Sequence, residues 1–401
     1  MPDAADASRQ SATLRQPPLW LLVLVTFSGT LAMHMFVPAL PAAAADLRAG
    51  VGAMQMTISL YIVGLAVGQL IYGPLSDCFG RRPTLLAGLA LYTAAGLGAA
   101  LAPDAGSLIA ARLLQALGGC AGLALGRAIV RDTTLSQDAV RRLALLNLMT
   151  MAGPALAPMI GSTLSATLGW RSIFLALVTL GAVNLLSVWR LLPETGRPSG
   201  ELSTRSLIQD YRHLLRSRMF VGFAVGGGCT TTAIYAFIAA APFLFVHELH
   251  RPVHEVGIYL GLLMVGMAAG NMLTGRLIGR ISMERLLVGA TLLVLASSLA
   301  FLAAVLLGLL TVPVAVGSMS LMTLGAGMSS PAALTQAISI DRRLTGSAAG
   351  LYGFIQMTVG AGFTALVAAG PDPALAAGLV LSLGGLVAQM SFWVAIRAQR
   401  A

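Results

Sequence analysis

The chain contains no lysine, and all 25 of its basic residues are arginine. The phosphate-binding loop of P-loop nucleotide hydrolases needs a lysine, so its absence excludes this route to ATP- or GTP-driven work. Cysteine is rare as well. The three cysteines, Cys78, Cys120 and Cys229, have neither metal-site nor redox spacing, and the sequence predicts no disulfide framework, no metal site and no cofactor.

Charge is scarce throughout the chain. Only 10% of the 401 residues are charged, whereas 57% are hydrophobic, and the mean hydropathy is +0.84. No soluble domain needs so much apolar surface, so a lipid bilayer surrounds most of the chain. A formal net charge of +10 would suit nucleic acid, but the arginines stand in short loops between apolar runs. We therefore expect no nucleic-acid partner.

Two interpretations exist for the first apolar run, which extends from Leu19 to Leu40. Arginines precede it and alanines follow it, as in a cleaved secretion signal. However, the run is longer than the roughly 7–15 apolar residues of such a signal. Pro38 and Pro41 also stand where cleavage would be set up. We interpret this run as the first membrane helix.

Apolar runs of membrane-spanning length recur along the whole chain. They lie near 19–40, 52–74, 83–102, 106–127, 141–166, 171–192, 219–246, 254–278, 284–307, 310–335, 346–369 and 374–396. These runs predict an all-α membrane protein with twelve transmembrane helices in two pseudo-symmetric six-helix halves. The predicted units are a tail at 1–18, a first bundle at 19–192, a linker at 193–218, a second bundle at 219–396 and a tail at 397–401.

The loop arginines are distributed unequally between the two sides of the membrane. With the N-terminus inside, one side collects the arginines of the motif loop, the linker and the C-terminal tail, whereas the other has only Arg48, Arg171 and Arg251. Loops rich in arginine stay in the cytoplasm. Both termini and the central linker are therefore predicted to be cytoplasmic.

A polar stretch from Gly73 to Pro83 separates the second and third runs, and we predict a short loop at the membrane surface. It resembles the loop between helices 2 and 3 of the major facilitator superfamily, with the signature Gly-x-Leu-x-Asp-x-x-Gly-Arg-(Arg/Lys)-x. The matching residues are Gly73, Leu75, Asp77, Gly80, Arg81 and Arg82. A degenerate copy, Gly270 to Arg280, follows the eighth run. The resemblance implies two parallel halves with a substrate site between them, near the membrane midplane.

The same resemblance implies a gate on the cytoplasmic side. In the superfamily the aspartate, here Asp77, faces the start of helix 11. The first arginine, here Arg81, pairs with an acid at the end of helix 4, here Asp132. These contacts would lock the halves while the cavity faces outward. In the alternative interpretation the loop is solvated and its charges only enforce topology.

Two further motifs lie in the fourth and fifth runs. Arg112 and Gln115 match the helix-4 motif of the family, which implies an arginine that faces the cavity. Alternatively, the arginine extends to the outer interface. Gly153, Pro158 and Gly161 resemble the helix-5 antiporter motif of export members, in which small residues allow close packing and proline kinks the helix.

The end of helix 1, from His34 to Pro41, closely resembles the Asp-Met-Tyr-Leu-Pro-Ala-Leu-Pro run of the Bcr/CflA-type drug:proton antiporters. The membrane acid of that family is His34 here, and all fifteen acidic residues of the chain lie in loops or at helix ends. If His34 and Arg112 both face the cavity, they would attract an anionic or carbonyl-rich substrate, whose binding would favour a protonated histidine. Alternatively, His34 only forms hydrogen bonds between helices.

The resemblance implies a monomeric exporter of small amphipathic, drug-like molecules in a bacterial inner membrane, coupled to protons and without enzyme chemistry. Tyr61, Tyr235 and Gln356 are the further polar residues that we expect to contact the substrate. One alternative is a dedicated exporter of an endogenous anionic metabolite, such as a siderophore or an organic acid. Another is a transporter-like sensor or membrane-embedded enzyme, which is disfavoured because the sequence offers no paired carboxylates, metal cluster or nucleophile–base set.

Overall fold

The structure is a computed structural model that describes residues 17–133, 156–196, 204–277, 280–340 and 344–400. Eleven helices in these ranges are long and apolar enough to cross a membrane, and a further apolar helix, Leu156–Leu168, is shorter. A helix pairs its backbone N–H and C=O groups internally, which a bilayer requires because lipid offers no hydrogen-bond partner. The predicted all-α architecture of membrane helices is confirmed.

The first half contains helices 1 to 6 of the predicted order. Its elements are α2 (Leu19–Phe36), η1 (Val37–Ala39), α3 (Leu40–Asp46), α4 (Val51–Phe79), α5 (Arg81–Ala100), α6 (Ala105–Thr133), the helix Leu156–Leu168 and α8 (Arg171–Leu191). Helix 1 comprises α2, η1 and α3. The fifth predicted run, 141–166, lies partly outside the described residues, and Leu156–Leu168 is its described end.

The second half repeats this layout after a linker helix, α9 (Thr204–Arg216). Its elements are α10 (Arg218–Thr231), α11 (Ile234–Phe243), η2 (Leu244–Glu248), α12 (Val253–Leu277), α13 (Met283–Leu306), α14 (Val312–Ile338), α15 (Thr345–Ala368) and α16 (Pro373–Arg400). Helix 7 comprises α10, α11 and η2. Gly308 lies in the turn between α13 and α14, with a φ of +66°, where the boundary between helices 9 and 10 is predicted.

The motif stretch between helices 2 and 3 is not the loop that its polarity predicts. Gly73 lies in the last turns of α4, with Pro74 inside the helix, and α5 begins directly at Arg81. Gly80 alone breaks the helical path, with a φ of +97°. A residue with a Cβ rarely adopts this φ, so glycine allows a one-residue turn where a longer loop was expected.

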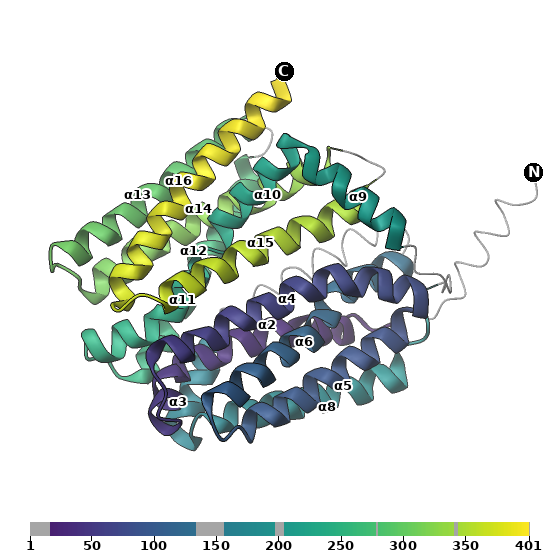
Figure 1. Cartoon of the computed structure of the whole chain (residues 1–401), viewed down its shortest axis with the longest axis horizontal. Helices are drawn as coiled ribbons and strands as arrows, with labels where there is room; N and C mark the ends of the chain where they lie inside the picture. The colour runs from purple at the N-terminus through teal and green to yellow at the C-terminus, as the bar shows by residue number, and fades with distance from the viewer. Residues whose placement is uncertain (1–16, 134–155, 197–203, 278–279, 341–343, 401) are drawn as a thin grey trace, which may run out of the picture.

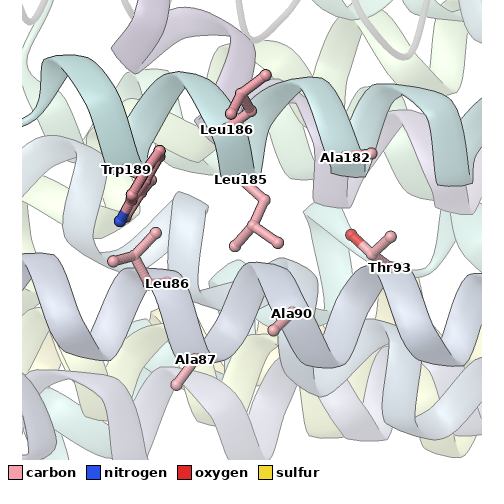
Figure 2. A pocket seen from close by; sticks show the side chains of 8 residues that line it. All are labelled: Leu86, Ala87, Ala90, Thr93, Ala182, Leu185, Leu186 and Trp189. Carbon is pink, nitrogen blue, oxygen red and sulfur yellow. The ribbon is translucent and has the colours of Figure 1, made fainter.

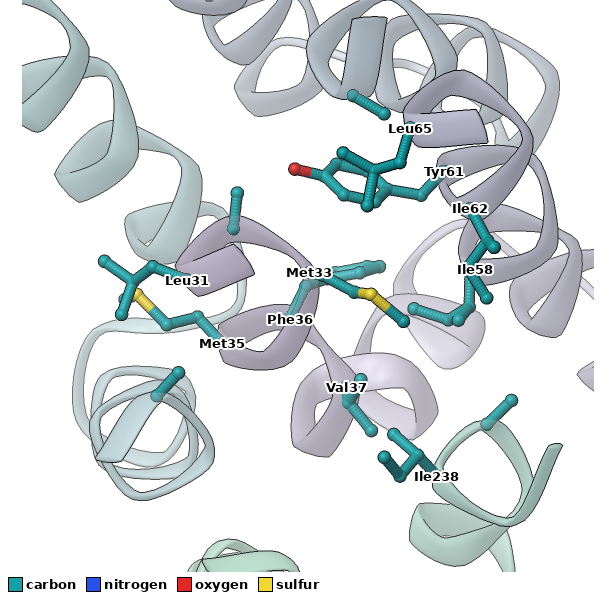
Figure 3. Close-up of a cluster of buried hydrophobic side chains, with 14 of the residues drawn as sticks. Leu31, Met33, Met35, Phe36, Val37, Ile58, Tyr61, Ile62, Leu65 and Ile238 are labelled. Carbon is teal, nitrogen blue, oxygen red and sulfur yellow. The ribbon is translucent and has the colours of Figure 1, made fainter. Parts of the chain in front are cut away.

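The two halves lie side by side, and α4 runs along α15 where they meet (Figure 1). At one end of this contact, a Cβ on Gly52 would lie 2.6 Å from the backbone oxygen of Ala368. Such an approach requires glycine. Near the same end, Val37 of the first half and Ile238 of the second belong to one cluster of buried apolar side chains (Figure 3). Apolar packing across the halves therefore closes this end, which is the one predicted to face outward.

The linker, predicted only as a polar stretch, contains α9 at the opposite end of the molecule from α3 (Figure 1). The hydroxyl of Ser347, in the first turn of α15, donates a hydrogen bond to Asp210 of α9 at 3.3 Å. Leu214 of α9 is buried in one apolar cluster with Phe220 and Leu351. The linker helix is thus docked on the second half.

Candidate functional site

Helices 1 and 7, the first helix of each half, are both interrupted within their membrane spans. In helix 1, α2 ends at Phe36, and a 3₁₀ turn that contains Pro38 follows. In helix 7, α10 ends at Thr231 and α11 begins at Ile234. Interrupted helices release backbone polar groups at the depth where many membrane transporters bind their substrates.

His34 is the titratable residue beside the interruption in helix 1. Its side chain is 4% exposed, and its Nδ1 lies 2.8 Å from the backbone oxygen of Thr30. A carbonyl oxygen can only accept, so Nδ1 carries the hydrogen in this contact and Nε2 is the second proton-binding atom. The ring meets Tyr235 edge-on across the two halves, with 6.2 Å between the ring centroids.

Tyr235 follows the interruption in helix 7, and Gln356 of α15 is bonded to that interruption. The hydroxyl of Thr232 donates to the backbone oxygen of Gln356 at 2.9 Å, and the Gln356 amide donates to the hydroxyl of Thr231. Tyr235 and Gln356 are both half-buried. The structure thus brings the predicted residues His34 and Tyr235 together, and it places Gln356 on the same interruption of helix 7.

Arg112 lies inside the first half and not on an open cavity wall. Its side chain is 0% exposed, and its guanidinium lies 4.0 Å from the ring centroid of Tyr61. The rings of Phe36 and Phe174 follow at 5.4 and 5.6 Å. Aromatic faces stabilise a cation that has left water. Tyr61 itself donates to the backbone oxygen of Gly29 at 2.7 Å, so its hydroxyl is occupied within the first half.

The hydrogen bonds of Arg112 are incomplete. Its Nη1 donates to the backbone oxygen of Ala32 at 3.1 Å and to Oε1 of Gln115 at 2.7 Å. In the described part of the chain, Nε and Nη2 of Arg112 and Nε2 of Gln115 are buried without a partner, and no carboxylate contacts the guanidinium. Unpaired buried donors are costly, and three of them around one positive charge suit an anionic acceptor.

His34 and Arg112 bond to the same stretch of helix 1, through the carbonyl oxygens of Thr30 and Ala32. Within the described ranges no hydrogen bond joins the two side chains directly. His34 faces Tyr235 of the second half, whereas the guanidinium of Arg112 is enclosed by aromatic rings of the first half. His34 and Arg112, which the sequence predicts in one site, therefore have separate surroundings and share only their contacts with helix 1.

Arg81 is the centre of the gating motif. Its Nη1 lies 2.7 Å from Oδ1 of Asp77, and its Nε lies 3.0 Å from Oδ2 of Asp132. The contact with Asp132 is the one that the motif predicts. These contacts join α4, α5 and α6 within the first half. The chain before α15 lies partly outside the described residues, so the expected approach of Asp77 to helix 11 stays a prediction, as does the gating role.

Glu194 is a residue of this network that the sequence reasoning missed. Its Oε1 accepts the backbone N–H of Arg81 at 2.9 Å, and its Oε2 accepts that of Arg82 at 3.2 Å. A carboxylate at a helix N-terminus complements the positive end of the helix dipole. Gly80 makes room for it, because a Cβ there would lie 2.6 Å from Oε2. The sequence signal that could have indicated this residue is an acid directly after a membrane helix, in Pro193-Glu194.

The helix-5 motif joins helices closely where it is described. Gly153 lies outside the described residues. A Cβ on Gly161 would collide with the backbone oxygen of Met35 in helix 1. Across the halves, a Cβ on Gly257 of α12 would lie 2.6 Å from the backbone oxygen of Pro158. Gly161 thus permits the backbone contact of helix 5 with helix 1, and Gly257 permits the contact of helix 8 with helix 5.

Two paired helical halves, interrupted first helices and an arginine motif between helices 2 and 3 define a membrane transporter. The sequence profile described as Major Facilitator Superfamily matches residues 22–365. The chain belongs to this family. It is accordingly a multi-pass transporter of small-molecule substrates and not an enzyme.

Known proteins show the same family at moderate identity. The chain is 28% identical over 380 residues to the uncharacterized MFS-type transporter YdgK of Bacillus subtilis (strain 168), covering 93% of this chain and 94% of that one. It is 30% identical over 267 residues to the multidrug transporter MdfA of Yersinia pestis bv. Antiqua (strain Angola), covering 66% of this chain and 65% of that one.

Solved structures share the fold. A D-xylose–proton symporter aligns with a TM-score of 0.74 at 16% identity, over 92% of this chain and 96% of that one. A bacterial homologue of the human lysosomal transporter Spinster aligns with a TM-score of 0.74 at 15% identity, over 95% of this chain and 96% of that one. At these identities the likeness concerns the fold alone.

Proposed function

We propose that this transporter exports small amphipathic molecules in exchange for protons, by alternating access to a site between its halves. The observation that carries the proposal is the position of His34, which is buried where the halves meet and contacts Tyr235. Histidine binds and releases a proton near neutral pH. The 30% identity to a multidrug transporter supports a drug-like cargo.

Proton binding would act on the packing between the halves. Nδ1 of His34 is bonded to Thr30, so Nε2 is the atom that gains or loses the proton. A neutral imidazole is compatible with burial against Tyr235, whereas a charged imidazole favours water or an anionic group. Protonation therefore favours a state in which the halves separate around His34, and deprotonation favours the closed packing.

Transport by purified protein in liposomes tests this proposal. We expect a fluorescent lipophilic cation to accumulate only when a pH gradient is imposed. His34→Asn keeps an N–H for the Thr30 carbonyl but cannot bind or release a proton near neutral pH. It should retain exchange of internal for external substrate and lose gradient-driven accumulation.

The matched control is His213→Asn, which removes an exposed histidine from α9 and should transport as the wild type does. Wild-type accumulation that is the same with and without a pH gradient would rule out proton coupling. Gradient-driven accumulation that survives in His34→Asn would remove His34 from the mechanism.

A dedicated exporter of an anionic or carbonyl-rich metabolite is the second candidate. It is favoured by the unpaired N–H groups of Arg112 and Gln115, which suit an anionic acceptor. Flux of organic acids and of lipophilic cations, measured in the same liposomes, separates the two candidates. His34→Asp should shift the substrate preference toward cations, because it adds a negative charge where the two halves meet. Unchanged selectivity in this variant would count against a charge-selective site at His34.

We further propose a monomer in a bacterial inner membrane, with both termini in the cytoplasm and the bundles 19–192 and 219–396 as its moving units. The arginine-rich linker and motif support this orientation, since basic loops stay inside. A periplasm-dependent phosphatase fused after Arg400 should be inactive, whereas the same reporter inserted at the turn of Gly308 should be active. The opposite pattern would invert the topology.

A further inference from the structure

We propose that a lipid-facing groove between α10 and α16 binds an anionic phospholipid, with the headgroup at the linker end and an acyl chain along the two helices. The groove has a volume of about 400 Å³. Its lining combines apolar side chains with two arginines, chiefly Val221, Val225, Met390, Val394, Arg216 and Arg218. We call it the α10–α16 groove.

The apolar part of the groove follows from the close packing of its two helices. A Cβ on Gly222 of α10 would lie 2.7 Å from the backbone oxygen of Ser391 and 2.8 Å from the Cβ of Ala395. The missing side chain lets the backbones approach and leaves a depression above the contact. Met390 and Val394 border it and are 70% and 42% exposed. In a membrane protein such a surface faces acyl chains.

Two arginines mark the end of the groove at which the linker helix meets α10. Arg216 is the last residue of α9 and Arg218 the first of α10, and both are exposed. Within the described ranges neither forms an ion pair. Arg397 of α16 stacks on Trp393 at 3.6 Å near the same end. Positive side chains beside an apolar groove complement a lipid phosphate that lies above its own acyl chain.

A second groove provides the contrast that makes the inference specific. It lies between α5 and α8, has a volume of about 600 Å³, and is lined by apolar residues and Thr93, with Trp189 at one end (Figure 2). No charged side chain lines it. Acyl chains can cover both grooves, but only the α10–α16 groove offers charge to a headgroup. We therefore expect headgroup selectivity at one groove and not at the other.

Native mass spectrometry of the full chain in detergent tests the proposal. Phosphatidylglycerol and phosphatidylcholine with identical acyl chains are the probes. Wild-type protein should bind phosphatidylglycerol more tightly. The double variant Arg216→Gln/Arg218→Gln removes both charges. It should weaken the binding of phosphatidylglycerol by about five-fold per arginine and leave the binding of phosphatidylcholine unchanged.

Two further variants assign the effect to the groove. Val225→Trp fills its apolar part and should weaken the preferred phosphatidylglycerol site without removing a charge. Arg190→Gln removes an exposed arginine at the end of α8 and should keep the preference. Equal binding of both lipids to the wild type would overturn the proposal. So would a preference that survives in the double arginine variant, or one that Arg190→Gln lowers to the same extent.

Discussion

Gly257 of the second half lies against the backbone oxygen of Pro158 of the first half, and this contact fastens helix 8 to helix 5. The hydroxyl oxygen of Ser162 lies beside the same glycine. Two helix backbones approach so closely only where a side chain is missing. Because Gly257 stands near the start of α12, the contact helps to close the outer end of the molecule.

Replacing Gly257 by valine should weaken this outer-closed state. Overpacking a tight contact costs about 1–3 kcal/mol, which lowers the ratio of closed to open molecules by about 5- to 150-fold. Spin labels at Asp104 and Leu309, in exposed turns of the first and second halves, should report longer distances in the variant. Gly289→Val is the matched control, since nothing lies within 4 Å of a Cβ at Gly289. Identical distance distributions would show that Gly257 does not hold the outer end.

Glu194→Ala should loosen the start of α5. The substitution deprives the backbone N–H groups of Arg81 and Arg82 of their acceptor, together with those of Thr195 and Gly196. The loss of hydrogen bonds to a charged group costs about 2 kcal/mol. A lower thermal unfolding midpoint should reveal it, whereas Glu194→Asp, which keeps the charge, should recover part of the loss. A midpoint equal to the wild type in Glu194→Ala would remove this structural role.

Gln115→Glu should pair the buried guanidinium of Arg112 with a negative charge. The glutamine oxygen already accepts from Nη1 at 2.7 Å, so the geometry for an ion pair is present. A hydrogen bond to a charged group stabilises by about 1.5–3 kcal/mol, and the thermal midpoint should rise. If an anionic cargo uses the open donors of Arg112, its export should fall in the same variant, while cation export persists. Anion export at the wild-type rate would exclude Arg112 as the recognition group.

The linker helix should undock at alkaline pH. Burial, and after it the carboxylate of Asp210, raises the pKa of Tyr211 above its ordinary value of 10.0. Above pH 10 an undocked tyrosine has lost its proton while the docked one keeps it. The docked state is therefore favoured below this pH and loses stability relative to the undocked state as the pH rises through the raised pKa. The thermal midpoint should fall less steeply above about pH 10 in Tyr211→Phe than in the wild type. Equal slopes would contradict this account.

In the described part of the chain the membrane helices can be predicted, because each must cover the bilayer with apolar side chains. The linker helix α9, the interruptions of helices 1 and 7 and the end of α4 cannot be predicted in this way. The polarity of the stretch from Gly73 to Phe79 predicts a loop. In the structure it continues α4, because Gly80 alone supplies the turn. A helix that emerges from lipid keeps its backbone bonds whatever its side chains are. Polarity therefore marks the membrane surface there, and not the end of the helix.

The sequence indicates which residues to consider for the candidate site, but it does not indicate the side chains that surround them. His34 and Arg112 carry signals in the sequence, a titratable ring and a charge inside apolar runs. The rings that enclose Arg112 carry none, because Phe36 and Phe174 look like any apolar residue until the fold brings α2 and α8 together. The separation of His34 from Arg112 depends on the rotation of α2 and α6, which a repeat of apolar residues all around each helix leaves undetermined.

The interruptions of helices 1 and 7 have a mechanical consequence. Each of these helices consists of two helical segments separated by an interruption. The segments are α2 and α3 in the first half and α10 and α11 in the second. An interruption of this kind permits the outer segment of each helix to change its tilt relative to the inner segment. We expect the two outer segments to tilt apart when the outer end opens. His34 and Tyr235, whose rings contact each other, lie beside the two interruptions about which this tilt would occur.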